Sequence, residues 1–206
     1  MKNILNKVLG YWKNEASIID KVIHIANIPE IKQGKSTLKI ELGLKGDIVL
    51  AITNSNKEKH CDVLIGIMPE LIQANPGFKL IIVGSLDQEE SIKAKIKELE
   101  LGKSIFFSTN LDNVELYKLM KASDMLVLND SLGFNQDRLR QAMKVGVPII
   151  ASNIDAYSKF ITNDVNGLLV DIGDKNKLVM NIIKLWNNRM IANDFIVNAQ
   201  EAISNS

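Results

Sequence analysis

The sequence contains few of the residues on which several classes of site depend. Among its 206 residues there are one cysteine and two histidines, aromatic residues make up only 5%, and the net charge is +1. One cysteine cannot form an internal disulfide, and His24, His60 and Cys61 lack metal-ligand spacing with one another, so we expect no metal site. Because the chain has no basic stripe with interleaved aromatic residues, we expect no binding to nucleic acid.

Long hydrophobic runs are also missing. The apolar stretches are far shorter than the roughly 20 residues that span a membrane, and the N-terminus lacks the apolar core and small-residue cleavage site of a signal peptide. We therefore expect a cytoplasmic protein. The contents of hydrophobic residues, 46%, and charged residues, 24%, are ordinary for a globular chain, and 206 residues suit one well-buried domain better than two.

Apolar segments alternate with amphipathic helical patterns from Asp47 onward. Strands that are apolar throughout, separated by helices, predict an α/β fold: an open, doubly wound parallel sheet of about six strands with helices on both faces. The expected strands cover 48–53, 79–84, 104–109, 125–130, 148–152 and 167–172. We expect Pro69 to kink or restart the helix after the first strand, and two helices between Lys175 and Ile203.

The N-terminal part of the chain has a different sequence pattern. Residues 1–21 predict a helical segment or linker, and residues 22–206 the main domain, beginning with a short strand at 22–27. The first helix is basic and amphipathic, with an apolar stripe formed by Ile4, Leu5, Val8, Leu9 and Trp12. An exposed stripe of this kind favours an interface, so we expect contact with a partner subunit or a second copy of the chain, or weak peripheral contact with a membrane.

The most informative segment runs from Met125 to Asp171. An apolar strand ends at a polar turn, an amphipathic helix follows, and Gly146-Val147-Pro148 ends that helix before the next strand. In doubly wound sheets, ligands bind beyond the carboxyl ends of the strands, where a helix N-terminus offers free N–H groups to a phosphate. Gly133 permits close backbone approach in the loop 131–136. An ordinary turn between a strand and a helix is the alternative interpretation of this loop.

This segment resembles the C-terminal, nucleotide-sugar-binding domain of the retaining GT-B glycosyltransferases, known as glycosyl transferases group 1 and similar to family 4. The family pattern is S-x-x-E-G-F-G-x-x-x-x-E-A-M-A-x-G-x-P. The residues that match it are Ser131, Gly133, Phe134, Ala142, Met143, Gly146 and Pro148. The resemblance extends over roughly residues 22 to 200. It implies a Rossmann-like domain that binds a UDP- or GDP-sugar and helps to transfer a hexose to a glycan, lipid or protein acceptor, without a cofactor.

Complete enzymes of this family carry a second, N-terminal domain that binds the acceptor. The resemblance therefore implies an acceptor-binding domain or partner subunit beyond this chain, or a homo-oligomer, and an isolated chain that is inactive.

The resemblance assigns the candidate catalytic residue, Lys59. In the family, a G-R-x-x-x-x-K-G pattern follows the first strand, and its Arg and Lys neutralise the donor's diphosphate. Here Lys59 keeps the Lys position, Asn54 stands at the Arg position, and His60 replaces the last Gly. Asn54 can donate only neutral hydrogen bonds, which are weaker than those of a guanidinium. An exposed loop lysine is the alternative interpretation of Lys59.

Further residues are expected to line the donor site. The family's second Glu, which holds the ribose hydroxyls, is replaced by Gln141, and no carboxylate replaces the first Glu. Asp130 and Asp137 are the nearest acids, and both are better explained as turn or capping residues. The loops after the other strands are expected to approach the nucleotide, and together with the loop 131–136 they give a donor-binding set: Asn54, Gly84, Ser85, Asn110, Leu111, Ser131, Gly133, Phe134, Asn135 and Gln141.

The missing Arg and Glu residues leave a second function open. A non-catalytic GT-B-like subunit would keep this scaffold and dock on, or regulate, an active glycosyltransferase. A relative of the nucleotide-sugar epimerases, which share the fold, is a weaker alternative.

Overall fold

The structure is a computed structural model, and it describes residues 31–53, 59–84, 89–108, 111–133 and 135–204. The helix expected at 1–12 and the strand expected at 22–27 lie outside the described residues. Nothing in the described part of the chain offers a helix with both the length and the hydrophobicity to cross a membrane.

Six parallel strands form one sheet, in the order β3-β2-β1-β4-β5-β6. The strands are β1 (Asp47–Ile52), β2 (Phe78–Val83), β3 (Ile105–Ser108), β4 (Met125–Leu128), β5 (Ile149–Ser152) and β6 (Leu168–Val170). Each of the six expected strands is confirmed, as is the doubly wound parallel fold. The chain first builds the sheet outwards from β1 to β3 and then returns to place β4 on the other side of β1. This reversal creates a topological switch point between β1 and β4.

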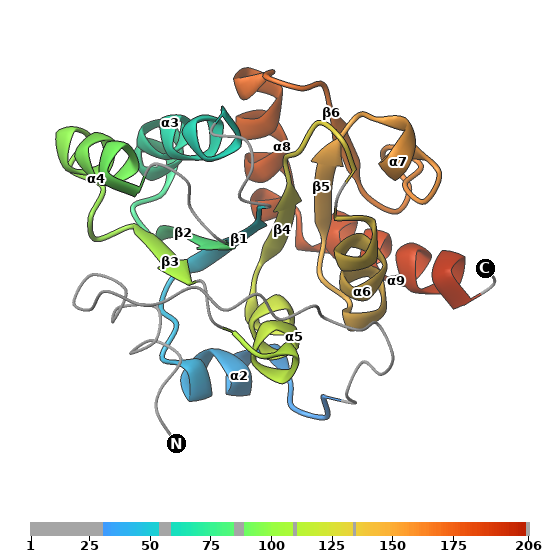
Figure 1. Cartoon of the computed structure of the whole chain (residues 1–206). Helices are drawn as coiled ribbons and strands as arrows, with labels where there is room; N and C mark the ends of the chain where they lie inside the picture. Colours follow the sequence, from blue (N-terminus) through green and yellow to red (C-terminus); the bar gives the residue numbers. More distant parts are fainter. Residues whose placement is uncertain (1–30, 54–58, 85–88, 109–110, 134, 205–206) are drawn as a thin grey trace.

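Helices cover both faces of the sheet (Figure 1). They are α2 (Lys35–Leu42), α3 (Lys59–Ala74), α4 (Glu89–Glu98), α5 (Asn113–Ala122), α6 (Gln136–Val145), α7 (Asp155–Ser158), α8 (Lys175–Asn187) and α9 (Arg189–Ser204). Buried side chains of α2, α5, α6 and α7 belong to one core cluster, and those of α3, α4 and α8 to another.

Successive side chains of a strand enter opposite clusters. In β1, Ile48 and Leu50 join the α5–α6 side, whereas Val49 and Ala51 join the α3–α8 side. A strand buried on both faces needs apolar residues at every position, because its side chains alternate between the faces. The continuous apolar runs of the sequence have this physical origin.

The helices differ from the sequence expectations in three places. α3 runs without interruption through Pro69 to Ala74, so the expected restart is absent. Its buried residues before and after the proline, including Leu64, Met68 and Leu71, anchor both halves to the sheet. The sequence patterns did not indicate α2 or the four-residue α7. The two helices expected at the C-terminal end are confirmed as α8 and α9.

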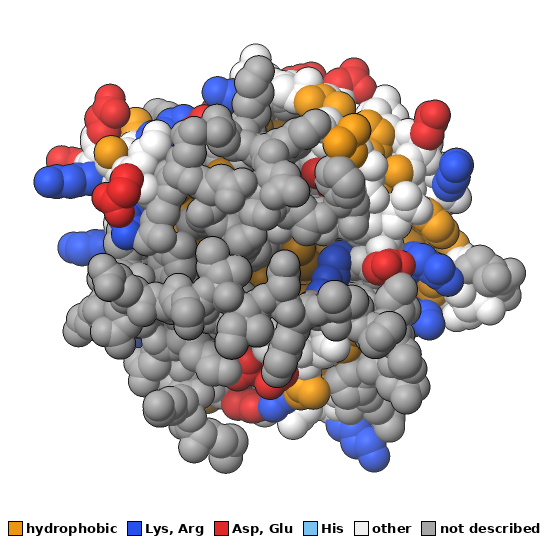
Figure 2. All heavy atoms as spheres, in the orientation of Figure 1, with side chains coloured by type: hydrophobic (Ala, Val, Ile, Leu, Met, Phe, Trp, Pro, Cys, Tyr) orange, Lys and Arg blue, Asp and Glu red, His pale blue; other side chains and the backbone are white. Residues whose placement is uncertain are grey.

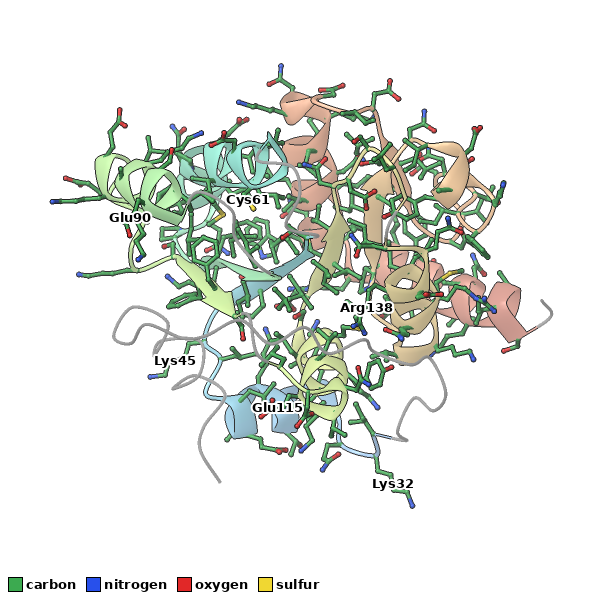
Figure 3. All side chains as sticks on the ribbon, viewed as in Figure 1. Lys32, Lys45, Cys61, Glu90, Glu115 and Arg138 are labelled. Carbon is green, nitrogen blue, oxygen red and sulfur yellow. The ribbon has the colours of Figure 1, made fainter. Side chains whose placement is uncertain are left out.

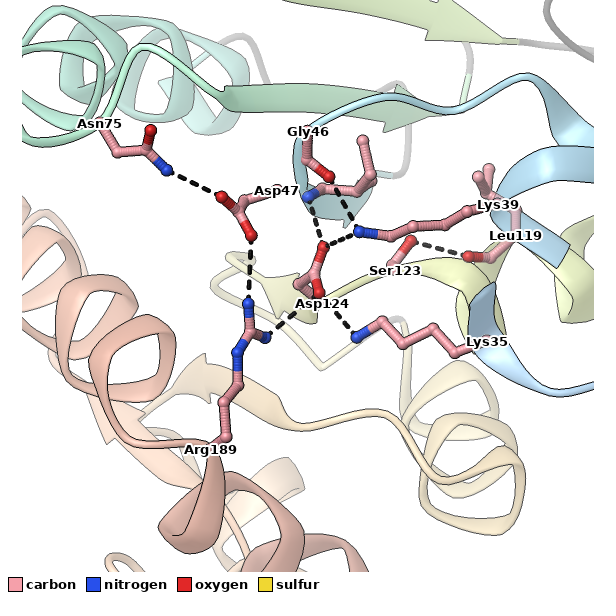
Figure 4. Close-up of polar contacts among 10 residues, drawn as sticks. Lys35, Lys39, Gly46, Asp47, Asn75, Leu119, Ser123, Asp124 and Arg189 are labelled. Carbon is pink, nitrogen blue, oxygen red and sulfur yellow. Dashed lines mark hydrogen bonds and ion pairs between the residues drawn. The ribbon is translucent and has the colours of Figure 1, made fainter. Parts of the chain in front are cut away.

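A polar network closes the edge at which the strands begin (Figure 4). Asp124, only 4% exposed, forms ion pairs with Lys35, Lys39 and Arg189 and accepts the Ile48 N–H at 2.8 Å. Arg189 also contacts Asp47, so the network connects α2, the starts of β1 and β4, and α9. These contacts lie at the opposite end of the strands from the switch-point loops, so this network serves the scaffold.

Candidate functional site

The candidate site lies at the carboxyl edge, the edge of the sheet where all six parallel strands end. Gly84 follows β2, Leu111 comes after β3, and Asp130 follows β4. The loops after β1 and β4 flank the switch point, which is where open α/β sheets bind their ligands. The topology therefore brings together the chain segments that the sequence analysis selected.

Asp130 organises the loop after β4. Its carboxylate is 6% exposed; Oδ1 accepts the N–H groups of Leu132, at 3.2 Å, and Gly133, at 2.6 Å. Its Oδ2 accepts the Asn135 side-chain amide at 3.2 Å and the hydroxyl of Tyr157 from α7. A buried carboxylate with four donors is well compensated for its loss of water. Asp130 thus organises the turn after β4, in agreement with the turn interpretation, and does not cap α6, whose N-cap position is Asn135.

These contacts change how the loop can bind an anion. The N–H of Gly133, which lies in the loop expected to approach a phosphate, already donates to Asp130. Burial raises the pKa of Tyr157, and its hydrogen bond to Asp130 raises it further, so Tyr157 stays a neutral donor at physiological pH. Among the described residues, the N–H groups at the start of α6 remain available to a ligand.

Gly133 is required by packing as well as by backbone conformation. Its φ is +69°, in the left-handed region, and an added Cβ would clash with the Cβ of Ala156. Gly84 has a φ of +141°, and its Cβ would clash with the carbonyl of Thr53 at the end of β1. Both glycines hold the ends of neighbouring elements close together at the carboxyl edge.

The start of α6 lacks a side-chain cap. Asn135 occupies the N-cap position, yet its amide donates to Asp130 and, at 3.5 Å, to the carbonyl of Ile52. No described side chain therefore accepts the first N–H groups of α6. Uncapped N–H groups at the positive end of a helix dipole provide favourable contacts for an anion.

Arg138 and Gln141 form a pair on α6. The Nη1 of Arg138 donates to Oε1 of Gln141 at 2.8 Å, and Gln141 is only 2% exposed. Arg138 is half-buried, and burial lowers the pKa of its guanidinium, with Tyr117 and Asp137 opposing this shift. Burial also raises the pKa of Tyr117 on α5, which the charge of Arg138 partly offsets.

A shallow recess lies on the α3–α8 side of the same edge. Its polar lining includes Asn129, Ser152, Asp171 and Asp174, at the ends of β4, β5 and β6 and the start of α8. Val63 of α3 also lines the recess, and Lys59 is the first residue of α3, one turn earlier. The start of α3 is therefore placed beside this recess.

The structure describes part of the expected donor-binding set. Gly84, Leu111, Ser131, Gly133, Asn135 and Gln141 lie at or near the carboxyl edge. Asn54, Ser85, Asn110 and Phe134 lie outside the described residues, and of Lys59 only the backbone position is described. Within the described part of the chain, no group of three or more His, Cys, Asp or Glu residues is placed to hold a metal ion.

Sequence reasoning missed Arg138. A cation in the first turn of a helix opposes the helix dipole and is an uncommon choice. That anomaly, three residues before Gln141 and next to the expected phosphate loop, was the signal that could have identified it.

Comparison with protein families and curated proteins gives consistent matches. Residues 35–202 match the model of the family described as glycosyl transferases group 1. The chain is 24% identical to D-inositol 3-phosphate glycosyltransferase of Segniliparus rotundus over 78% of its length, and 25% identical to phosphatidyl-myo-inositol mannosyltransferase of Mycobacterium leprae over 70%. It spans only 37% and 38% of those two relatives.

Solved structures share the fold. The C-terminal domain of the group 1 glycosyl transferase LpcC from Francisella tularensis superimposes with a TM-score of 0.73 at 16% identity, covering 90% of this chain and 98% of that domain. HepE of Anabaena, in complex with UDP-glucose, gives a TM-score of 0.72 at 23% identity and covers 83% of this chain and 48% of HepE.

Proposed function

Since the chain belongs to the glycosyl transferases group 1 family, we propose that it is the donor-binding part of a glycosyltransferase. In this proposal a nucleoside diphosphate sugar binds at the carboxyl edge, across the switch point between β1 and β4. The hexose is transferred to a glycan, lipid or protein acceptor with retention at the anomeric carbon, in the cytoplasm.

The loop after β4 is the observation that carries the proposal. Asp130 links this loop through Asn135 to the end of β1 and through Tyr157 to α7. The loop leads into the uncapped start of α6. A preformed loop that presents free N–H groups suits a phosphate-bearing ligand, because little ordering free energy is lost on binding.

The chemistry assigned to the site is mainly electrostatic. Negative charge collects on the diphosphate as its bond to the sugar breaks, and a positioned cation stabilises that charge. Lys59, at the start of α3 beside the recess, is proposed to supply this cation. Gln141 would hold the ribose hydroxyls through neutral hydrogen bonds.

The acceptor site is proposed to come from elsewhere. The chain spans less than two fifths of the two curated relatives named above. An acceptor-binding domain, a partner subunit or a second copy of the chain would complete the interdomain cleft in which transfer takes place.

Ligand-dependent thermal stability tests the proposal. With a dissociation constant near 1 mM, 10 mM UDP or GDP should stabilise the fold by about 1.4 kcal/mol, which corresponds to a rise of about 3–5 °C in the melting temperature. UDP and GDP should be measured beside uridine and guanosine, which lack the phosphates. The same small effect from all four compounds would contradict the proposal.

A non-catalytic subunit is the second candidate, and one observation favours it. The carboxylate of Asp130 already occupies the Leu132 and Gly133 N–H groups, so the loop is complete without a ligand. A subunit of this kind would keep the scaffold and dock on an active glycosyltransferase. It predicts no stabilisation by either nucleoside diphosphate at 10 mM.

A further inference from the structure

Within the described part of the chain, Arg138 is a charged side chain whose hydrogen-bonding capacity is largely unused. A guanidinium has five N–H donors, and the contact found for Arg138 is one bond to the neutral Oε1 of Gln141. Among the described residues, no carboxylate lies within ion-pair distance of it. Because the side chain is half-buried, water replaces these missing contacts only in part.

The position of Arg138 in its helix is also unfavourable for a positive charge. Arg138 lies in the first turn of α6, where the helix dipole disfavours a positive charge. Figure 3 shows its side chain between α6 and α5, and in the same view Figure 2 shows Lys or Arg atoms at the surface near the centre of this face, beside hydrophobic side chains. A half-buried guanidinium in this position gains more from an anionic ligand than a fully solvated one would.

The contact with Gln141 indicates which part of a nucleotide Arg138 would meet. In the proposed function Gln141 holds the ribose, and the guanidinium lies 2.8 Å from its carbonyl oxygen. A cation this close to the side chain that is proposed to hold the ribose can reach the phosphate attached to that ribose. On the facing helix, the buried Oδ1 of Asn113 has no hydrogen-bond partner among the described residues, and Asn113 precedes Tyr117 by one turn.

We propose that Arg138 binds the α-phosphate of the donor nucleotide, the phosphate attached to the ribose. The inference rests on the proposed function and extends it. Arg138 supplies from α6 the guanidinium that Asn54 does not supply at the end of β1, while Lys59 at the start of α3 serves the β-phosphate.

Four variants, including the conservative Arg138→Lys, test this assignment against three ligands. Arg138→Gln removes the proposed contact, and Arg140→Gln is the matched control, since Arg140 lies on the same helix, is exposed, and contacts the ring of Phe160. Lys59→Gln removes the cation assigned to the β-phosphate. Dissociation constants should be measured by NMR titration for the preferred nucleoside, its monophosphate and its diphosphate.

The expected pattern depends on the phosphate number. Arg138→Gln should weaken the binding of the monophosphate and of the diphosphate by the same factor, about tenfold, and leave the affinity for the nucleoside unchanged. Lys59→Gln should weaken the binding of the diphosphate alone. Arg140→Gln should change all three dissociation constants by less than about twofold. Arg138→Lys, which keeps a charge but loses the planar fork, should recover part of the loss.

Several outcomes would overturn the assignment. If wild-type protein binds the nucleotides and Arg138→Gln binds them equally well, the assignment fails and the proposed function stands. An equal loss for nucleoside and nucleotides, with no recovery in Arg138→Lys, would make Arg138 a structural residue only. If the wild-type chain binds no nucleotide, the proposed function fails together with the assignment.

Discussion

At the scale of single residues, the loop after β4 depends on the carboxylate of Asp130. Asp130→Asn keeps the shape of the side chain but replaces one acceptor oxygen with a donor, which faces the donors Asn135 and Tyr157 or the loop N–H groups. We expect a loss of about 1–3 kcal/mol in the free energy of unfolding, measured in urea. Asp137→Asn, at an exposed position of α6, should stay within about 0.5 kcal/mol of wild type. Equal stability of both variants would contradict the central role of Asp130.

Gly133 provides a second test at this scale. Gly133→Ala places a Cβ in the left-handed region of the backbone and against the Cβ of Ala156. The conformational strain alone costs about 1–2 kcal/mol, and the clash adds to it. Gly102→Ala is the control, because nothing lies within 4 Å of the added Cβ and its backbone needs no left-handed conformation. The free energies of unfolding of the two variants, measured in urea, should differ by at least this conformational strain. Equal urea midpoints would contradict the packing described for Gly133.

The candidate site was only partly predictable at the residue scale. Gly133, Asn135 and Gln141 stand out because glycine and amide residues are informative beside a predicted strand end. The partners of Asp130 could not be predicted, because Tyr157 lies 27 positions further along the chain and meets Asp130 only after folding. The spacing of Arg138 and Gln141 was available in the sequence, but the pairing depends on the burial of both side chains.

At the scale of elements, α2 depends on ionic contacts with Asp124. Burial would raise the pKa of Asp124, but Lys35, Lys39 and the Ile48 N–H outweigh it, so the pKa lies below its ordinary value. A carboxyl group with a lowered folded-state pKa stabilises the fold above its unfolded pKa, and the contribution disappears as the pH falls through the folded value. The stability that Asp124 contributes should therefore be lost below about pH 4.

Asp124→Asn tests this contribution. At pH 7 the variant should lose about 2–3 kcal/mol of unfolding free energy, because a buried charged acceptor and its ion pairs are removed. Between pH 4 and pH 2 the variant should lose less stability than wild type does, since it lacks the titrating group. Parallel pH profiles for the two proteins, from urea unfolding at each pH, would show that Asp124 contributes nothing to acid denaturation.

The elements differ in how far local sequence determines them. The strands were predictable because each is apolar on both faces, which leaves no alternative to a buried parallel sheet. The helix α2 was not predictable from its own sequence, because Ile40 is 82% exposed and only Leu38 and Leu42 are buried. Its ion-pair partner Asp124 lies some 80 residues further on. Long-range packing also explains why α3 continues through Pro69, because tertiary contacts override a local break.

At the scale of the whole molecule, the chain corresponds in extent to one domain of its structural neighbours. It covers 98% of the isolated C-terminal domain of LpcC and 48% of HepE. In the proposed function another domain or subunit supplies the acceptor-binding surface, so the purified chain should transfer no sugar from a nucleoside diphosphate sugar to any acceptor. Mass spectrometry of the reaction products would detect transfer, and a glycoside formed by the chain alone would contradict the prediction. Slow hydrolysis of the donor would not.

The central claim, a nucleotide site at the carboxyl edge, is tested most directly by its position. Backbone amide shifts of the isotopically labelled chain should be followed during titration with UDP and with GDP. The account predicts perturbations at Gly84, at Leu111–Asn113 and across Ser131–Gln141, with an affinity near 1 mM. Perturbations gathered instead around Asp47, Asp124 and Arg189, at the opposite edge of the sheet, would contradict it.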